Sequence, residues 1–379
     1  MKRSTERILT THTGSLPRPD DLLAAMEARA AGAASASIGA TLARAVADIV
    51  RSQVEVGVDI VNDGEMSKPS YATYVKDRLS GFEGEAAPLA IADLGDYPEY
   101  GERFMSQSAV RNLARPACTG PVKCKDASAV QTDIANLKAA VTKTPVAEAF
   151  MSAASPGVIS IFLANHYYKK QDDYLAALAE AMRPEYQAIT DAGLILQIDC
   201  PDLAMGRHIQ FPDASLAEFR KNITAHVEAL NHALEGISAE RTRIHLCWGN
   251  YEGPHHRDVP LRDIIDIVFK ANVGGISYEA SNPRHEHEWA VFEEVKLPAG
   301  KVLIPGVIDS VNNFIEHPEL VAQRISNIAR LVGRENVMAG TDCGFATVAG
   351  YSVVDPKIAW AKFQSLAEGA RIASRKLFQ

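Results

Sequence analysis

Residues 194–199 read LILQID, residues 216–236 read LAEFRKNITAHVEALNHALEG, and residues 242–247 read TRIHLC. The first and third segments are short apolar runs, whereas the second spaces its apolar residues as a helix does and ends at a glycine. A helix between two short apolar runs is typical of parallel strands with a covering helix. The stretch 194–247 therefore predicts an α/β fold.

The same alternation extends toward both ends of the chain. Six further apolar runs are predicted as strands, namely RILTTH (7–12), VDIVND (58–63), GVISIFLA (157–164), GGISYE (274–279), KVLIPGVI (301–308) and NVMAGT (336–341). Helical patterns lie between them, for example at 38–57, 172–193 and 318–333. Eight strand and helix units predict a single catalytic (β/α)₈ TIM-type barrel over residues 1–379.

One interval departs from this alternation of strands and helices. Residues 81–156 separate the second and third predicted strands by more chain than one helix requires. The interval contains the tract DLGDYPEYGERFM (93–105), the turn-rich ARPACTGPVKCK (114–125) and a helical pattern near Ala127–Val141. We therefore predict that residues 81–156 form an ordered insertion between strand 2 and helix 2, which caps the barrel.

The composition narrows the classes of function. The chain has 379 residues, of which 47% are hydrophobic and 23% charged, and a net charge of -8, so it lacks the basic character of nucleic-acid-binding proteins. The amino-terminal segment lacks the apolar core of a signal peptide, and no stretch is long and apolar enough to span a membrane. Five scattered cysteines favour reduced thiols over a disulfide framework. We therefore expect a cytoplasmic protein.

Reactive side chains gather at the predicted carboxyl ends of the strands, where barrels of this type form their active sites. His245 and Cys247 occupy positions i and i+2 of one strand, so both side chains point to the same face and can share one ion. Glu279 and Cys343 follow the sixth and eighth predicted strands. Imidazole and thiolate ligands favour Zn²⁺ over Mg²⁺ or Ca²⁺. These four residues are predicted to bind Zn²⁺.

Several segments resemble those of cobalamin-independent methionine synthase. IHLCWGN (244–250), ISYEASN (276–282) and GTDCGFAT (340–347) are similar to the zinc segments of that family in order and spacing, and TTHTGSLPRP (10–19), DGEMSK (63–68) and LILQIDCPDLAM (194–205) are similar to other segments. The resemblance implies that the thiol of homocysteine, or of a related substrate, binds zinc and attacks as a thiolate. It also implies that Glu65 and Asp199 hold the amino group of that substrate and that Ser15 binds its carboxylate.

One segment departs from the family. Where the methionine synthases have a segment like YDIHSP, whose histidine protonates the leaving group, this chain has VIDSVNNF (307–314). Asp309 remains as a candidate catalytic residue, but Val311 occupies the matched histidine position, which places folate as the methyl donor in question. The candidate replacement acids are His166 and four other histidines, His255, His256, His285 and His287. Those four are not expected to form a second metal site.

Three functions remain open. The leading one is a zinc-dependent thiol S-alkyltransferase that methylates homocysteine or a similar thiol, with methyl-folate or methylcobalamin as donor. The single-barrel length and the tracts WGNYEGPHH (248–256) and ASNPRHEHEW (280–289) also resemble the shorter branch that includes epoxyalkane:coenzyme M transferase, in which a zinc-bound thiolate opens an epoxide. The third is a non-catalytic barrel that binds zinc or a corrinoid protein. Such a barrel has no need of carboxylates beside the metal ligands, so we expect an enzyme.

Overall fold

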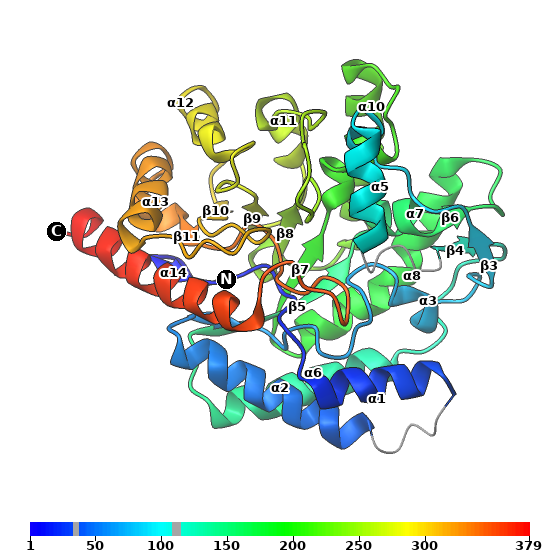
Figure 1. The fold of residues 1–379 in the computed structure, drawn as a ribbon, viewed down its shortest axis with the longest axis horizontal. Coiled ribbons are helices and arrows are strands. Elements are labelled where there is room, and N and C mark those ends of the chain that lie inside the picture. Colours follow the sequence, from blue (N-terminus) through cyan, green and yellow to red (C-terminus); the bar gives the residue numbers. More distant parts are fainter. Residues whose placement is uncertain (33–37, 108–114) are drawn as a thin grey trace.

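The computed structural model describes residues 1–32, 38–107 and 115–379. Its centre is a curled parallel sheet of six strands in the order β10-β9-β8-β7-β5-β2, so the predicted α/β class is confirmed (Figure 1). The strands are β2 (Ile60–Val61), β5 (Glu148–Ala154), β7 (Ile195–Asp199), β8 (Thr242–Leu246), β9 (Gly275–Tyr278) and β10 (Val302–Pro305). Nearly every residue in them is buried, as their continuous apolar sequences indicate.

A second parallel pair, β1 (Leu9–Thr10) with β11 (Met338–Ala339), lies between the two edges of this sheet. The amide of Asp59, next to β2, donates a hydrogen bond to the Thr10 carbonyl oxygen over 3.2 Å. On the other side, the amide of Gly340 donates to the Pro305 carbonyl oxygen of β10 over 3.0 Å. The first and last predicted strands of the chain therefore lie next to each other.

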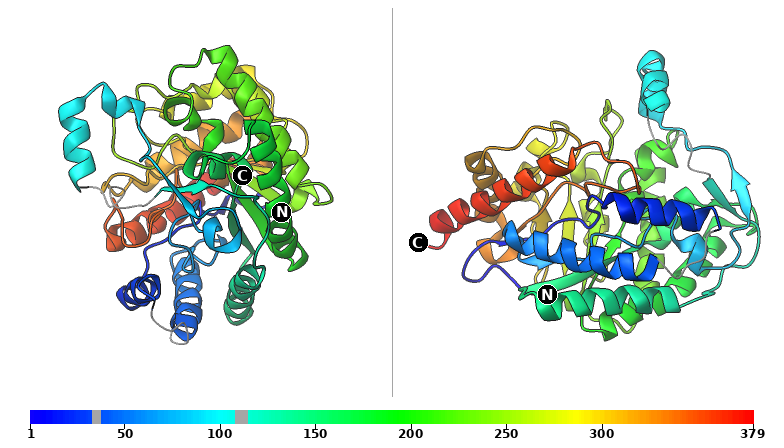
Figure 2. Two further views of the ribbon diagram at one scale, coloured as in Figure 1. Left: turned by 90° about the vertical axis from the view of Figure 1, so that its right-hand side faces the viewer. Right: turned by 60° about the horizontal axis from the view of Figure 1, so that its bottom comes forward.

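Long helices cover the outside of the sheet. Those predicted from the sequence are α2 (Ile38–Glu55), α6 (Ser128–Lys143), α8 (Gln171–Asp191), α10 (Leu216–Ala233) and α13 (Pro318–Val332), and α1 (Asp20–Ala30) and α14 (Pro356–Leu377) complete the set of long helices. Figure 2 shows α1, α2 and α6 side by side on one face. No helix among the described residues is both long and apolar enough to cross a membrane.

The prediction of a strand at 157–164 was wrong. Residues Pro156–Phe162 form the helix α7, because the Ser155 hydroxyl accepts a hydrogen bond from the amide of Val158 (2.9 Å) and Pro156 occupies the first turn. The third strand of the barrel order is β5, which pairs with β7 in parallel. Because α6 and β5 belong to the strand and helix alternation, the interval 81–156 is also too long for the predicted insertion.

A smaller layer lies beside the carboxyl ends of the strands. It contains β3 (Gly84–Ala86), β4 (Arg115–Cys118), α4 (Ala92–Gly95) and α5 (Pro98–Gln107), and we refer to residues 84–107 and 115–118 as the cap. β4 also pairs with β6 (Ala164–Asn165). On the other side, the Phe104 ring of the cap packs against Tyr251 in the loop after β8, with ring centroids 5.6 Å apart. The cap therefore contacts the loops at this end of the sheet.

A buried arginine fixes the amino-terminal segment against the sheet. The Arg243 guanidinium on β8 donates hydrogen bonds to Thr11 Oγ1 (3.1 Å), to the His12 carbonyl oxygen (2.9 Å) and to Gln197 Oε1 (2.9 Å). The Gln197 amide in turn donates to the Thr13 carbonyl oxygen. Because buried backbone acceptors need partners, these contacts hold the turn after β1 over the ends of β7 and β8.

Candidate metal centre

Three side chains predicted as metal ligands converge at the carboxyl ends of β8 and β11. His245, Cys247 and Cys343 are all buried, and one potential ligand atom from each lies within 4.8 Å of the others. The two sulfur atoms are 3.7 Å apart and are not joined in a disulfide. A strand places His245 at its end and Cys247 two residues later on the same face, while the loop after β11 brings Cys343.

The donor atoms of this trio fit a zinc ion. His245 Nδ1 lies 3.1 Å from the Ser277 hydroxyl oxygen, while its Nε2 atom is buried and has no hydrogen-bond partner. Burial lowers the pKa of His245 to about 3, so the ring is neutral and can offer a lone pair. The amide of Gly249 donates to Cys247 Sγ over 3.3 Å. Imidazole and two sulfurs, oriented by second contacts, form a typical partial zinc ligand set.

Glu279, the fourth predicted ligand, lies outside this trio. Its Oε1 atom accepts a hydrogen bond from the amide of Trp248 (3.2 Å), and its Oε2 atom accepts one from the Asn282 side chain (2.9 Å). Burial raises the pKa of its carboxyl group, and the carboxyl group also interacts with Cys247. Glu279 is therefore next to the centre, and its coordination of the ion stays a prediction.

A cavity of about 280 Å³ opens beside the trio. His245, Cys247 and Cys343 contribute to its wall, together with the three residues predicted to bind substrate, Ser15, Glu65 and Asp199. These six residues come from distant parts of the sequence, and the fold brings them to one space.

Glu65 and Asp199 place two carboxyl groups in the wall of this cavity. The Ser152 hydroxyl donates to Glu65 Oε1 over 2.6 Å, whereas Glu65 Oε2 is buried without a hydrogen-bond partner. The backbone of Glu65 has a φ of 57°, a left-handed conformation that is unfavourable for this residue. Burial first, and the charge of Glu65 second, raise the pKa of Asp199 to about 8. Such a pair is suited to a cationic group.

Because this pair is electrostatically unfavourable, we expect Asp199→Asn to raise the melting temperature, and more so at higher pH. The pKa of Asp199 rises from 3.8 to about 8 on folding, so the folded state retains a proton that the unfolded chain releases, and stability is lost as the pH rises through this range. Asparagine does not titrate. The test is thermal unfolding of the wild type and of Asp199→Asn at about pH 4 and about pH 8, in the same metal state. A difference in melting temperature that is equal at the two pH values contradicts the prediction.

The cap supplies a largely apolar wall to the same cavity, which the sequence did not predict. Its apolar contributors in the cap are Pro88, Leu89, Ile91, Phe104 and Met105, and Arg115 of the cap also lines the cavity. On the side of the sheet, the wall continues through Tyr71, Phe162, Met205 and Ile209. No spacing in the sequence indicated these residues, because the cap lies far from the metal ligands along the chain.

Asp309 and Val311 line a neighbouring cavity of about 380 Å³, together with Glu279 and Asp342. The carboxylate of Asp309 accepts a hydrogen bond from the amide of Val311 over 2.6 Å. Asn250 separates the two cavities, because its side chain donates to the Gly344 carbonyl oxygen (2.9 Å) and lines both spaces.

His166 does not reach either cavity, and its prediction as the replacement acid was wrong. Its side chain is exposed, and its amide bonds to the Cys118 carbonyl oxygen (2.9 Å) in the small sheet. The reason is the error at 157–164, since a helix and then β6 carry this segment away from the strand ends.

Comparisons with known proteins agree with this architecture. The sequence is 27% identical over 374 residues to a methionine synthase of Saccharolobus islandicus (strain Y.N.15.51 / Yellowstone #2), which covers 97% of this chain and 95% of that protein. It is 25% identical over 371 residues to a methionine synthase of Sulfolobus acidocaldarius, covering 97% and 93%.

The fold is similar to that of a B12-independent methionine synthase from Shewanella sp. W3-18-1 in complex with selenomethionine, with a TM-score of 0.74, 20% identity, and coverage of 98% of this chain and 99% of that one. A putative vitamin-B12 independent methionine synthase from Listeria monocytogenes gives a TM-score of 0.65 at 19% identity, covering 97% and 98%. Residues 8–359 match the family described as the catalytic domain of cobalamin-independent synthase. The chain therefore belongs to the family of cobalamin-independent synthase catalytic domains.

Proposed function

We propose that this protein is a zinc-dependent S-methyltransferase that methylates homocysteine. One observation carries the proposal, namely that a single cavity is lined both by the His245, Cys247 and Cys343 trio and by the Glu65 and Asp199 carboxylates. The first group suits an ion that binds sulfur, and the second suits an ammonium group, so together they suit a thiol that carries an amino group. Relatives named methionine synthase support the same substrate.

We also propose that β1 and β11 complete an eight-stranded (β/α)₈ barrel over residues 1–379, with the cap as an insertion after β2. The backbone hydrogen bonds from Asp59 to β1 and from Gly340 to β10 support this closure. A cytoplasmic location is part of the proposal, because cysteine ligands must remain reduced thiols to bind zinc.

His245, Cys247 and Cys343 would hold the zinc ion, with Glu279 as the fourth ligand. When bound, zinc lowers the pKa of a coordinated thiol so that it ionises at neutral pH. Glu65 and Asp199 bind the ammonium group of homocysteine, and Ser15 binds its carboxylate. These contacts orient the sulfur, and the apolar wall of the cap excludes water from it.

The candidate donors of the alkyl group are methyl-folate, methylcobalamin and an epoxide. A second function, epoxide opening by a thiol, is favoured by the apolar cap wall and by Val311, which cannot protonate a leaving nitrogen. Asp309 is our candidate for proton transfer, since it lines the neighbouring cavity.

The test is a titration of the Co²⁺-loaded protein with homocysteine, with 4-mercaptobutyrate, which lacks only the amino group, and with coenzyme M. We expect homocysteine to increase the thiolate-to-cobalt absorption, to release a proton and to bind more tightly than the other two thiols. Absence of any response to the three thiols would overturn the proposal. Tighter binding of coenzyme M would favour the second function, and product analysis with each donor then identifies the electrophile.

Gly14→Ala is expected to weaken homocysteine binding by about 10- to 100-fold, the cost of a small misplacement in a site. A Cβ atom at this position would lie 2.7 Å from Glu65 Oε1, and Gly14 has a φ of 150°, so the carboxylate must move. Gly39→Ala is the matched control, because its Cβ atom would meet nothing within 4 Å. The KM for homocysteine measures the effect, and equal values for both variants contradict it.

A further inference from the structure

A second group of possible metal ligands lies apart from the proposed catalytic centre. Asp93 of α4, His208 of α9 (Gly206–Ile209) and Asp258 of the loop after β8 are all buried, and one ligand atom from each lies within 4.8 Å of the others. We propose that these three residues bind a second divalent transition-metal ion, which fastens the cap to the body of the protein. This site goes beyond the proposed function and does not depend on it.

The first argument is the state of Asp93. Its side chain has 0% of its surface exposed, and neither carboxylate oxygen has a hydrogen-bond partner. A buried carboxylate without a partner is costly, whereas coordination of a cation compensates its charge. Burial, together with the charges of Asp93 and Asp258 and a side-chain contact with Asp93, raises the pKa of the nearby Tyr251 hydroxyl. Asp93 thus presents a buried carboxylate to the space that it shares with His208 and Asp258.

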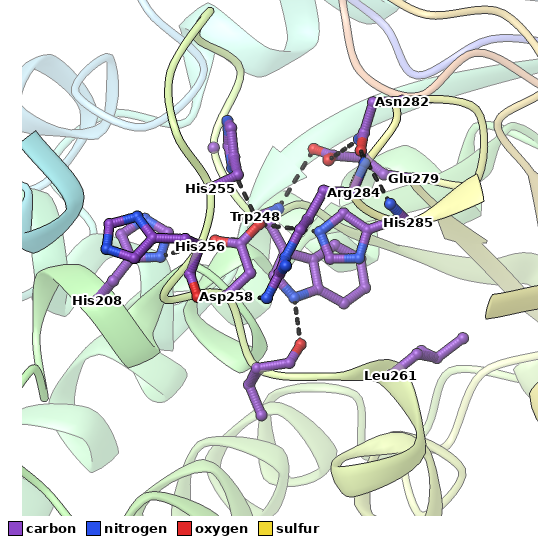
Figure 3. A network of polar contacts seen from close by, with 12 residues as sticks. His208, Trp248, His255, His256, Asp258, Leu261, Glu279, Asn282, Arg284 and His285 are labelled. Carbon is purple, nitrogen blue, oxygen red and sulfur yellow. Dashed lines mark hydrogen bonds and ion pairs between the residues drawn. The ribbon is translucent and has the colours of Figure 1, made fainter. Parts of the chain in front are cut away.

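The second argument is the arrangement around Asp258. Its Oδ2 atom lies 2.9 Å from His255 Nδ1 and 2.9 Å from His285 Nε2, and Glu288 lies 2.8 Å from the other nitrogen of His285 (Figure 3). Burial opposes ionisation, but the surrounding imidazoles hold the pKa of Asp258 below its usual range. Its Oδ1 atom has no hydrogen bond. Two histidines therefore hold one oxygen, while the other oxygen faces His208, and such outer contacts are typical of metal sites.

The third argument is His208. Its Nδ1 atom lies 3.1 Å from Asp258 Oδ1, and its buried Nε2 atom has no hydrogen-bond partner. Two ligand atoms at about 2 Å from a tetrahedral ion lie about 3.3 Å apart, close to this distance. Imidazole with two carboxylates favours zinc and similar transition metals over Mg²⁺ and Ca²⁺, which prefer oxygen ligands alone.

An ion at this place would connect the cap to two loops of the reaction cavity. Ile91, which lies two residues before Asp93, lines that cavity, and Tyr251 lines it too. Asp96, at the end of α4, already forms an ion pair with Arg257 (2.6 Å), which is exposed and therefore weak. The buried ion would order the cap, and the cap would then hold the apolar wall of the cavity in place.

The test uses metal stoichiometry in the purified full chain, after equilibrium dialysis of metal-free protein against Zn²⁺ or Co²⁺. We expect two equivalents in the wild type and one in Asp93→Asn and in His208→Gln, both of which keep the thiolate-to-cobalt absorption of the cysteine site. Cys343→Ser should also bind one equivalent, but without that absorption. The matched control is His226→Gln, because His226 and Asp202 form a similar buried pair (3.0 Å) outside both groups, and it should bind two.

A second measurement separates a metal site from a merely structural cluster. In the Cys343→Ser background, Zn²⁺ should raise the melting temperature and slow amide hydrogen exchange in residues 92–95, and adding Asp93→Asn should abolish both effects. Without metal, Asp93→Asn should be more stable than its parent, since it removes an unpaired buried charge. No bound metal in Cys343→Ser, undiminished metal content in Asp93→Asn and His208→Gln, or no effect of Zn²⁺ on the melting temperature of Cys343→Ser would each overturn the proposal, whereas loss of the cysteine-site absorption alone would count only against the proposed function.

Discussion

Replacing Cys343 with serine is expected to remove one equivalent of metal and to lower methyl transfer to homocysteine by more than about 100-fold. Loss of a residue that only orients a ligand costs 10- to 100-fold in affinity or activity, so loss of a ligand itself should cost more. Cys343 Sγ lies 3.7 Å from Cys247 Sγ, and serine neither ionises nor binds zinc as a thiolate does. A free thiol with a pKa of about 8.5 is only about 3% ionised at pH 7.

The measurements are metal content and the rate of product formation at saturating homocysteine. Cys118→Ser is the matched control, because Cys118 is buried in the cap, where its thiol donates to the Gly120 carbonyl oxygen over 3.3 Å. It should retain both metal and activity. Full metal content in Cys343→Ser would show that the trio is not the ligand set. Loss of metal without loss of activity would show that methyl transfer does not require the ion.

Most of the sheet could be predicted because its strands are buried on both faces. The runs at 194–199, 242–247 and 274–279 each contain a parallel strand, and the burial of these strands is a consequence of helices on one side and the barrel interior on the other. The run at 157–164 has the same character but forms α7, which is buried on nearly all sides. Periodicity alone does not distinguish a buried helix from a buried strand.

The sequence signal that distinguishes the helix α7 from a strand is short. Ser155 and Pro156 provide an amino-terminal cap and a first helical residue, and they outweigh the strand-like composition that follows. The strand β5 lies before them in EAFMSAA, a segment with no β-branched residue, so its sequence gave little indication of a strand. Its pairing with β2 and β7 determines its conformation.

The candidate site was predictable to the extent that its residues follow strands. His245 lies in β8 and Cys247 directly follows it, and parallel strands bring Asp199 and Cys343 to the same end. The cap residues have no such constraint, since their positions depend on tertiary packing against loops. Asp93, for this reason, could not be connected with His208 or Asp258 from the sequence.

Three features of the Glu65 and Asp199 pair are unfavourable for folding. Glu65 adopts a left-handed backbone, one of its oxygens has no partner, and its charge opposes the ionisation of Asp199. A structure selected only for stability would avoid this combination. Under the proposed function, an ammonium group that binds beside these carboxyl groups would offset the unfavourable terms, so binding energy and specificity for an amino group would have the same origin.

Glu65→Gln is therefore expected to raise the KM for homocysteine by on the order of 10² to 10³, with little change in kcat, because one partner of a buried charged contact is lost. Glutamine keeps the shape of the side chain and can accept the hydrogen bond from Ser152. 4-Mercaptobutyrate, which has no amino group, serves as the control substrate, and its KM should be unchanged or lower. Initial rates with both thiols over a range of concentrations provide the comparison.

The same variant should shift the pH dependence of homocysteine binding. In the wild type, ionisation of Asp199, with a pKa raised to about 8 by burial and then by Glu65, should lower the KM as the pH rises toward this value. Glu65→Gln removes the second of these causes, so the pKa of Asp199 falls and the decrease in KM should occur at lower pH. An equal loss of affinity for both thiols, with no shift along the pH axis, would mean that Glu65 supports the fold of the cavity and does not bind the amino group.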